Sequence, residues 1–250
     1  MLVFFSVLYN PGPNALENIA LAKSVGIQSI VYLNKVDAEY LKQLEALDIV
    51  ILGNNVNDGL GVAFSEIEEL LKKREVENFI YFDQDTVVGK SAWLDILKSY
   101  ADHFLGKDVG MLYYSGYKRP ISSVVISSGC VFSIRVIDEI GNHDASFFVE
   151  GVDYEFCLRL KQNGYRIVNV FNAGIDHDIL QDQHQKQIFG IKYSLRVYGQ
   201  KRLNDFNVSH AKLIKMSLRY KQLRMAVFFL KSFIVFNCRE FFSRFMMVVM

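Results

Sequence analysis

Apolar and polar residues alternate in blocks along the first hundred positions of the chain. Short continuous apolar runs, typical of strands buried on both faces of a sheet, occupy residues 2–9, 27–33, 48–53 and 78–82. Between these runs the apolar residues recur at helical spacing, over residues 14–25, 37–47, 60–74 and 92–104. The alternation predicts a Rossmann-like α/β fold with a mostly parallel sheet flanked by helices.

The pattern changes beyond residue 105. Strands are expected over 109–114 and 122–134, and a helix over 152–163 that ends before Gly164 and leads into a further strand. From residue 181 onward the segments have helical spacing and many Lys, Arg, Phe and Met residues. We therefore predict one α/β domain over residues 1–180, with two halves at 1–105 and 106–180. A helical C-terminal extension is predicted over residues 181–250.

The composition indicates a folded protein, because 51% of the residues are hydrophobic and 22% are charged. Three cysteines lie far apart, at Cys130, Cys157 and Cys238, and form no CxxC pair. That usage favours a reducing compartment. The apolar N-terminal run has no basic flank, so it is interpreted as a first strand and not as a signal peptide.

Charge is distributed unevenly along the chain. From His184 to the end there are 13 Lys and Arg residues against two Asp and Glu residues, although the whole chain carries a net charge of +1. A basic tail is typical of contact with a membrane or a nucleic acid. No nucleic-acid recognition motif is present, so the membrane is favoured and nucleic acid is not expected.

The last segment is very apolar, but Arg224, Lys231 and Arg239 interrupt it at near-heptad spacing. No run reaches the roughly 20 apolar residues that a transmembrane helix requires. The pattern is typical of a helix that lies in the bilayer interface with its basic residues toward anionic head groups. Two alternatives remain: packing on the preceding domain, or packing on a second copy in a homodimer.

Two carboxylates stand one residue apart where the fourth apolar run stops, in Asp83-Gln84-Asp85. Most isolated D-x-D sequences are solvated turns. Here the pair follows a buried strand, and ligands of open α/β sheets bind beyond the carboxyl ends of strands. Two ionised carboxylates at this separation repel unless a cation lies between them, and divalent cations prefer carboxylate oxygens. The pair therefore predicts a divalent metal site.

Seven stretches of the chain resemble, in order and spacing, the family 2 glycosyltransferases, specifically their rhamnosyltransferase-like branch. They are YNP at 9–11, NDGLGVAFS at 57–65, YFDQDT at 81–86, SSG at 127–129, GNHDASFFVEGVDYEFCLR at 141–159, His177, and YSLRVYGQKR at 193–202. The resemblance covers about residues 1–202. It implies a GT-A fold, a nucleotide-diphosphate sugar donor, a Mg²⁺ or Mn²⁺ cofactor and inversion of the anomeric centre. The donor would bind to the first half of the domain and the acceptor to the second.

The resemblance also implies roles for individual residues. Asp85 would ligate the metal, Asp83 would face the donor sugar or ribose and assist the metal, and His177 would complete the coordination. Asp153 would be the catalytic base, with Glu155 as the alternate, although Glu155 is also spaced to pair with Arg159. The residues that would bind the donor are Tyr9, Asn10, Pro11, Asn34, Asn57, Gly59, Asp83, Gln84, Ser128 and Gly129.

Two positions depart from the pattern of the family. Leu33 stands where an Asp that reads the nucleotide base is common, and Ser65 stands where an Asn is common. Because of these departures, the sequence does not decide whether the donor is dTDP-rhamnose or a UDP-sugar. The acceptor implied is a glycan or a lipid-linked glycan of a surface polysaccharide, which places the protein in the cytoplasm, on the inner face of the cell membrane.

Two other functions are considered. The string FDQDT also fits the D-x-D-x-T of haloacid-dehalogenase-like phosphatases, in which Asp83 would be the nucleophile. That family carries its nucleophile after the first strand, whereas three predicted strands precede Asp83. The chain could instead be a non-catalytic, membrane-associated binding module. Dinucleotide oxidoreduction is not expected, because no G-x-G-x-x-G follows the first strand.

Overall fold

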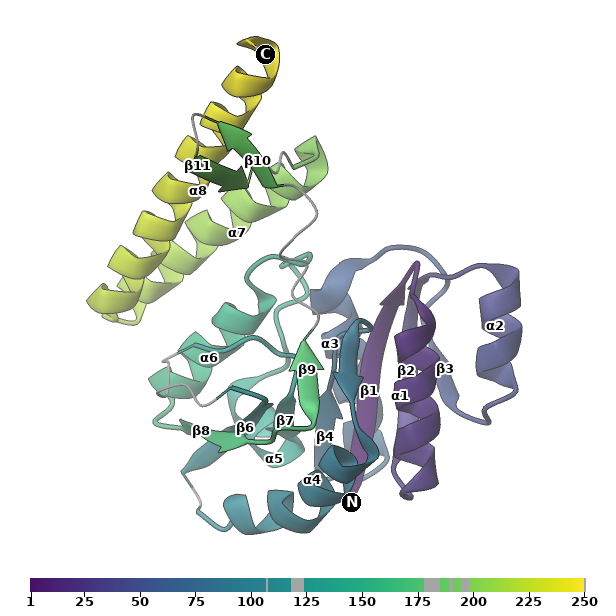
Figure 1. Ribbon diagram of the computed structural model, residues 1–250. Helices are drawn as coiled ribbons and strands as arrows, with labels where there is room; N and C mark the ends of the chain where they lie inside the picture. The colour runs from purple at the N-terminus through teal and green to yellow at the C-terminus, as the bar shows by residue number, and fades with distance from the viewer. Residues whose placement is uncertain (107, 118–123, 178–184, 189–190, 195–197, 250) are drawn as a thin grey trace. The chain divides into compact units, whose positions relative to one another are not determined.

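The computed structural model describes the chain outside residues 107, 118–123, 178–184, 189–190, 195–197 and 250. The chain divides into two compact units, Met1–Asp178 and Ile179–Met250 (Figure 1). Among the described residues, no helix is both long enough and apolar enough to cross a membrane.

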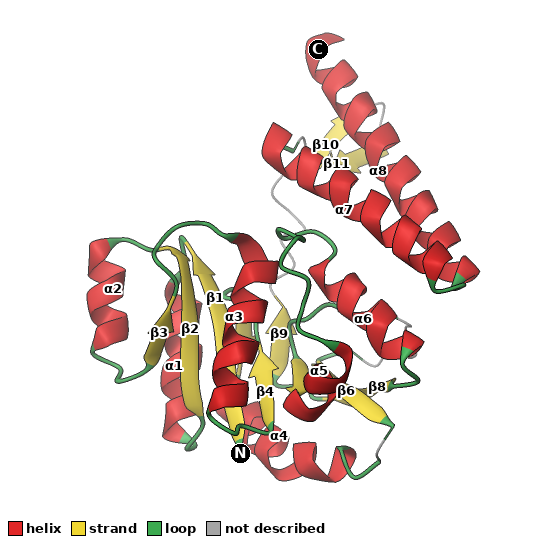
Figure 2. Cartoon of the chain, turned by 180° about the vertical axis from the view of Figure 1, so that it is seen from behind, coloured by secondary structure: helices red, strands yellow, loops and turns green. Residues whose placement is uncertain are grey.

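The first unit is built on a seven-stranded sheet with the strand order β3-β2-β1-β4-β7-β6-β8 (Figure 2). Strands β3, β2, β1 and β4 are parallel, β7 is antiparallel to both of its neighbours, and β8 is parallel to β6. The bounds are β1 Leu2–Tyr9, β2 Gln28–Lys35, β3 Val50–Leu52, β4 Asn78–Tyr81, β6 Val109–Ser115, β7 Cys130–Ser133 and β8 Arg166–Phe171. This arrangement confirms the predicted GT-A-like α/β fold with a mostly parallel sheet.

Helices cover both faces of this sheet. They are α1 Pro13–Ser24, α2 Ala38–Glu45, α3 Gly59–Lys73, α4 Lys90–His103, α5 Ile134–Ile140 and α6 Val152–Gln162. Successive side chains of a strand point to opposite faces. Phe4 of β1 accordingly packs edge-on against Trp93 of α4 at 5.0 Å, while Phe5 packs against Phe64 of α3 at 5.6 Å. Burial on both faces explains why the strands are continuous apolar runs.

The strands that precede the acidic motif all end at one edge of the sheet. Parallel pairing brings the carboxyl end of β1, at Tyr9, and that of β4, at Tyr81, to this edge. Strand β7 runs in the opposite direction and begins at Cys130, which pairs with Tyr81. The segment Ser127–Gly129 therefore enters the sheet beside the acidic motif. Gly129 has φ +89°, and a Cβ there would lie 2.2 Å from the Tyr114 carbonyl oxygen.

Two short strands were not predicted. β5, Thr86–Val88, pairs antiparallel with β9, Ile175–His177, so that Thr86 lies opposite His177. The strand expected over 122–134 is shorter: among the described residues of that range only Cys130–Ser133 is strand, and α5 starts at Ile134. The pairing of β5 with β9 places the backbone of His177 beside the acidic motif.

The second unit contains a helical hairpin, α7 Gln200–Arg219 and α8 Leu223–Val249. Phe206 of α7 stacks on Phe236 of α8 at a ring separation of 3.7 Å. The unit also contains an antiparallel strand pair, β10 Gln185–Ile188 and β11 Ile191–Ser194. The expectation that everything beyond residue 181 is helical was therefore wrong for these strands.

Candidate active site

The acidic motif follows β4 immediately. Asp83 is half-buried and Asp85 is exposed. The buried Tyr81 hydroxyl donates a hydrogen bond to Asp83 Oδ1 at 2.7 Å. Burial, and then the negative charge of Asp83, raise the pKa of Tyr81 well above its usual value, so the phenol remains protonated and orients this carboxylate.

Gln84 joins this motif to the end of β1. Its Nε2 donates to the Tyr9 carbonyl oxygen at 3.0 Å, and its Oε1 accepts from the Tyr9 amide at 2.7 Å. The next residue, Asn10, has φ +46°, and its backbone N–H donates a hydrogen bond to the Lys35 carbonyl oxygen at 2.7 Å. The side-chain amide of Gln84 therefore joins the ends of β1 and β4. The side chain of Tyr9 is 44% exposed at this edge of the sheet, and Pro11 is partly buried.

Two adjacent serines connect the acidic motif to α6. Ser128 Oγ accepts from the Asp83 amide at 3.0 Å and lies 2.9 Å from Thr86 Oγ1. Ser127 Oγ donates a hydrogen bond to Asp153 Oδ1. Both serines are buried. The dipeptide thus fixes the backbone of Asp83 on one side and the carboxylate of Asp153 on the other.

Asp153 lies in the first turn of α6, after Gly151, which adopts φ +84°. Burial raises the pKa of the Asp153 carboxyl to about 6; the hydrogen bond from Ser127 opposes this, the charge of Asp83 adds to it, and His143 opposes it. A carboxyl group with a pKa near 6 is mostly ionised at neutral pH, and it is a stronger base than an ordinary aspartate. The charge of Asp83 acts on the carboxyl group of Asp153, so the structure places these two predicted site residues close to one another.

Glu155 has a different environment. It is buried, and both of its carboxylate oxygens accept hydrogen bonds from Arg159. Arg159 also donates to the carbonyl oxygens of residues 140, 141 and 142. The predicted i,i+4 pair is confirmed, and it leaves Glu155 as an anchor for this loop, not as a free base.

Three of the predicted donor-binding residues lie around the loop before α3. Asn34 is buried, accepts from the Asp58 amide at 3.0 Å and donates to the Gly59 carbonyl oxygen at 3.3 Å. Gly59 has φ +87°, and a Cβ there would lie 2.5 Å from the Phe148 carbonyl oxygen. Asn57 is exposed on this loop. Asn34 and Gly59 therefore shape the loop, and Asn57 is the member that faces solvent.

The acidic motif is chemically suited to a divalent cation. Mg²⁺ is commonly held by one or two protein carboxylates together with substrate phosphates, and Asp83 and Asp85 supply two carboxylates from one turn. Among the described side chains, no group of three or more His, Cys, Asp or Glu residues could hold a metal on its own. The backbone of His177 pairs with Thr86, next to Asp85, but the His177 side chain lies outside the described structure.

A buried pair that was not predicted from the sequence, Glu68 and His143, packs against α6, the helix that carries Asp153. His143 donates its amide to Glu68 Oε2 at 2.8 Å and pairs with Glu68 Oε1 through Nδ1; both side chains are fully buried. The imidazole is stacked between Phe64, at 4.3 Å, and Phe156 of α6, at 4.1 Å. The sequence does contain an indication of this pair. Glu68 lies four residues after Phe64 on the apolar face of α3, and a carboxylate on a buried face needs a partner.

Comparisons with known proteins find a curated relative in sequence and solved structures with a similar fold. No family model matches the chain. A curated relative, the dTDP-rhamnosyl transferase RfbF of Shigella flexneri, is 28% identical over 189 residues, which span 63% of this chain and 62% of the relative. The chain spans somewhat less than two thirds of the length of that relative.

Solved structures of S. aureus TarS share the fold of this chain. Residues 1–349 of TarS in complex with UDP superpose with a TM-score of 0.55 at 14% identity, covering 92% of this chain and 70% of that chain. The same TarS fragment in complex with UDP-GlcNAc gives a TM-score of 0.54 at 13% identity, covering 92% and 71%. At this identity the likeness concerns the fold, which is GT-A.

Proposed function

We propose that the chain is an inverting glycosyltransferase that transfers a sugar, rhamnose being the first choice, from a nucleotide diphosphate to a glycan or lipid-linked acceptor of a surface polysaccharide. The observation that supports this most strongly is the meeting of Asp83, Asp85 and Asp153 at the carboxyl edge of the sheet around Tyr81, whose pKa all three raise. The similarity to a dTDP-rhamnosyl transferase and to the fold of TarS supports the same class of reaction.

In the proposed reaction Asp153 accepts the proton of the acceptor hydroxyl. The hydroxyl oxygen forms a bond to the anomeric carbon while the bond from that carbon to the diphosphate oxygen breaks. The electron pair of the broken bond stays on the β-phosphate oxygen, and one displacement inverts the anomeric centre. The hydrogen bond from Ser127 orients Asp153 for this transfer.

Asp85, assisted by Asp83, would hold Mg²⁺ or Mn²⁺. Such a cation would neutralise negative charge on the departing nucleoside diphosphate. The position of His177 opposite Thr86 supports its assignment as a further ligand. Tyr9 and Asn57, which are exposed near the strand ends, are proposed to contact the nucleotide.

The proposed place of action is the cytoplasmic face of the cell membrane, where the second unit would meet lipid. The free cysteines Cys130 and Cys157, both buried, are compatible with a reducing compartment. The similarity in sequence to a dTDP-rhamnosyl transferase disfavours the haloacid-dehalogenase-like phosphatase. The presence of Asp83, Asp85 and Asp153 together disfavours a non-catalytic binding module derived from a transferase.

A thermal-shift screen tests the proposal. The protein is heated with dTDP-rhamnose, dTDP-glucose, UDP-glucose or UDP-GlcNAc, each with Mn²⁺, Mg²⁺ or a chelator. A ligand that binds the folded state at 100 times its Kd stabilises that state by about 2.7 kcal/mol, so one nucleotide sugar is expected to raise Tm by several degrees in the presence of a cation. A screen in which no nucleotide sugar raises Tm would contradict the proposal.

A further inference from the structure

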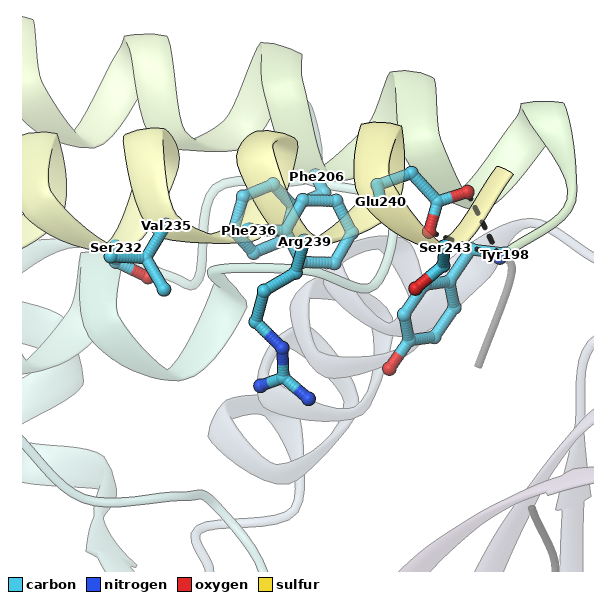
Figure 3. A pocket seen from close by; sticks show the side chains of 8 residues that line it. All are labelled: Tyr198, Phe206, Ser232, Val235, Phe236, Arg239, Glu240 and Ser243. Atoms are coloured by element: carbon cyan, nitrogen blue, oxygen red, sulfur yellow. Dashed lines mark hydrogen bonds between the residues drawn. The ribbon is translucent and has the colours of Figure 1, made fainter. Parts of the chain in front are cut away.

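Three glutamates are buried among the described residues of the chain: Glu68, Glu155 and Glu240. Glu155 pairs with Arg159, four residues later. Glu240, in the second unit, pairs in the same way with Arg244, and it also accepts a hydrogen bond from the Tyr198 amide (Figure 3). An arginine is not deprotonated in proteins, so these two pairs hold a constant charge.

Glu68 of α3 has a different kind of partner. The residue four positions later is Lys72, whose Nζ lies 3.2 Å from Asp138 and donates to Asn142 Oδ1 at 2.6 Å. Glu68 accepts instead from His143, through the backbone N–H and through Nδ1 of the ring. Nε2 of His143 has no hydrogen-bond partner among the described residues, so Glu68 fixes a proton on Nδ1. Of the three buried glutamates, Glu68 is therefore the one whose partner can gain and lose a charge.

Groups that interact favourably with a protonated imidazole lie on three sides of His143. The Glu68 carboxylate lies at one edge of the ring, and both side chains are fully buried. The ring is stacked between Phe64, at 4.3 Å, and Phe156, at 4.1 Å, and a cation within about 6 Å of an aromatic centroid is attracted to the ring face. A neutral imidazole would leave an ionised Glu68 as a buried, unbalanced charge. The surroundings of His143 therefore suit the positive partner of an ion pair.

The ring of His143 lies against the helix that carries the proposed base. Phe156, on which the ring stacks, follows Asp153 by three residues, so the two project from neighbouring positions of α6. Glu68 belongs to α3, so the positive partner of the pair is the one that contacts α6. Burial raises the pKa of Asp153 to about 6, and the charge of His143 opposes this rise. The pair is therefore placed where its charge acts on the protonation of Asp153.

Other titratable groups interact with Asp153 from the neighbouring elements: Asp83 and Tyr81 at the end of β4, Cys130 of β7, and Tyr154 and Cys157 of α6. Burial raises the pKa of the two phenols and the two thiols, so all four stay neutral near pH 6. Asp83 is negative and opposes ionisation of Asp153. Asp144, next to His143, is exposed. The charge of Arg159 on α6 is matched by both carboxylate oxygens of Glu155. Among these groups, His143 is the cation that acts on Asp153.

We propose that His143, held by Glu68, is a positioning residue of the transferase, whose positive charge keeps Asp153 ionised and ready to accept the proton of the acceptor hydroxyl. A nearby positive charge favours the ionised form of a carboxyl group, and histidine is the side chain that carries such a charge in the range in which Asp153 titrates. The link to catalysis rests on the proposed function, but the effect on Asp153 is measurable without turnover.

An NMR titration of the Asp153 carboxyl carbon in the full chain tests the proposal. His143→Phe with Glu68→Leu replaces the buried pair by apolar side chains of similar size, a change that buried ion pairs often tolerate. The titration midpoint of Asp153 should move upward by about one pH unit, the low end of the effect of an opposite charge nearby. His143→Gln with Glu68→Gln keeps polar side chains but removes both charges, and it should move the midpoint equally. Glu69→Gln with Lys72→Gln removes a more exposed ion pair from the same helix and should leave the midpoint in place.

Turnover provides the second measurement. In the variants that lack the buried pair, the acid limb of kcat/KM should move upward together with the Asp153 midpoint, while KM for the donor stays unchanged. An unchanged midpoint in both variants of the buried pair would overturn the proposal, and so would equal shifts for the buried pair and the surface pair. A wild type that transfers no sugar would contradict the proposed function without affecting the carboxyl titration, so the two failures are distinguishable.

Discussion

Ser127 donates a hydrogen bond to the carboxylate of Asp153, and through its neighbour Ser128 the same turn holds the amide of Asp83. One buried dipeptide therefore sets the position of the proposed base relative to the proposed metal site. It also sets the protonation of the base, because the Ser127 hydrogen bond lowers the pKa of Asp153 while burial raises that pKa to about 6.

The first prediction concerns the pH dependence of transfer. Asp153 must be ionised to accept a proton, so kcat/KM should fall about tenfold per pH unit below pH 6. Ser127→Ala removes a hydrogen bond that lowers the pKa, and the acid limb should move upward by about one pH unit. Ser128→Ala is the control: its hydroxyl contacts the Asp83 amide and Thr86, so the limb should stay in place. If the acid limb of kcat/KM stays at the same pH in Ser127→Ala, Asp153 is not the titrating group.

The second prediction separates the two acidic residues of α6. Asp153→Asn keeps an acceptor for Ser127 but cannot take a proton, so kcat should fall by about 10²–10⁴ while donor binding is kept. Glu155→Gln should reduce kcat less than tenfold, because Glu155 is bonded to Arg159. Its effect should appear instead in the thermal stability. If Glu155→Gln loses turnover and Asp153→Asn keeps it, the base has been assigned to the wrong residue.

The third prediction follows from linkage at Asp153. Its folded pKa, about 6, lies above the ordinary value of 3.8, so the stability from this group is full below pH 4 and is lost as the pH rises through 6. Asp153→Asn does not titrate. Relative to the wild type, this variant should gain about 1–2 kcal/mol between pH 4 and pH 7.5, after allowance for partial exposure. Urea unfolding at both pH values measures the difference; a constant difference would mean that the pKa is not raised.

The fourth prediction concerns the buried pair beneath the site. Glu68→Leu leaves the amide and Nδ1 of His143 without their acceptor, and each buried polar group that loses its hydrogen bond costs about 1–3 kcal/mol. Glu69→Leu, on the exposed side of the same helix, should change the urea midpoint little, because its contacts with Lys72 and Asn142 are at the surface. Similar midpoints for the two variants would show that the pair does not stabilise the first unit.

The parts of the fold that the sequence predicted are those in which one physical requirement dominates. β1, β2 and β4 are buried on both faces, so their continuous apolar runs are unambiguous. The three-residue strands β5 and β9 are too short to show a period, and they form because distant segments meet. The segment around Ser127 was expected to be part of a longer strand, although its role comes from a turn that only the tertiary structure defines.

In the candidate site, too, some features could be predicted from the sequence and others could not. The position of Asp83 and Asp85 at the end of a buried strand could be predicted, because the two carboxylates directly follow a continuous apolar run. Gln84 and Asn34 were expected to bind the donor, but their side-chain amides are engaged with the backbone. A polar side chain near a ligand and a polar side chain that supports a loop look alike in sequence, and the difference lies in contacts across the sheet edge.

Calorimetric titration of dTDP-rhamnose tests the central claim most directly, namely that a cation held at Asp83 and Asp85 binds the donor diphosphate. The wild type, Asp85→Ala and Asp153→Asn are titrated in Mn²⁺, and the wild type is titrated again with a chelator. The account predicts equal binding by the wild type and Asp153→Asn, and at least a hundredfold loss, about 2.7 kcal/mol, for Asp85→Ala and for the chelated wild type. Equal affinity in all four titrations would contradict it.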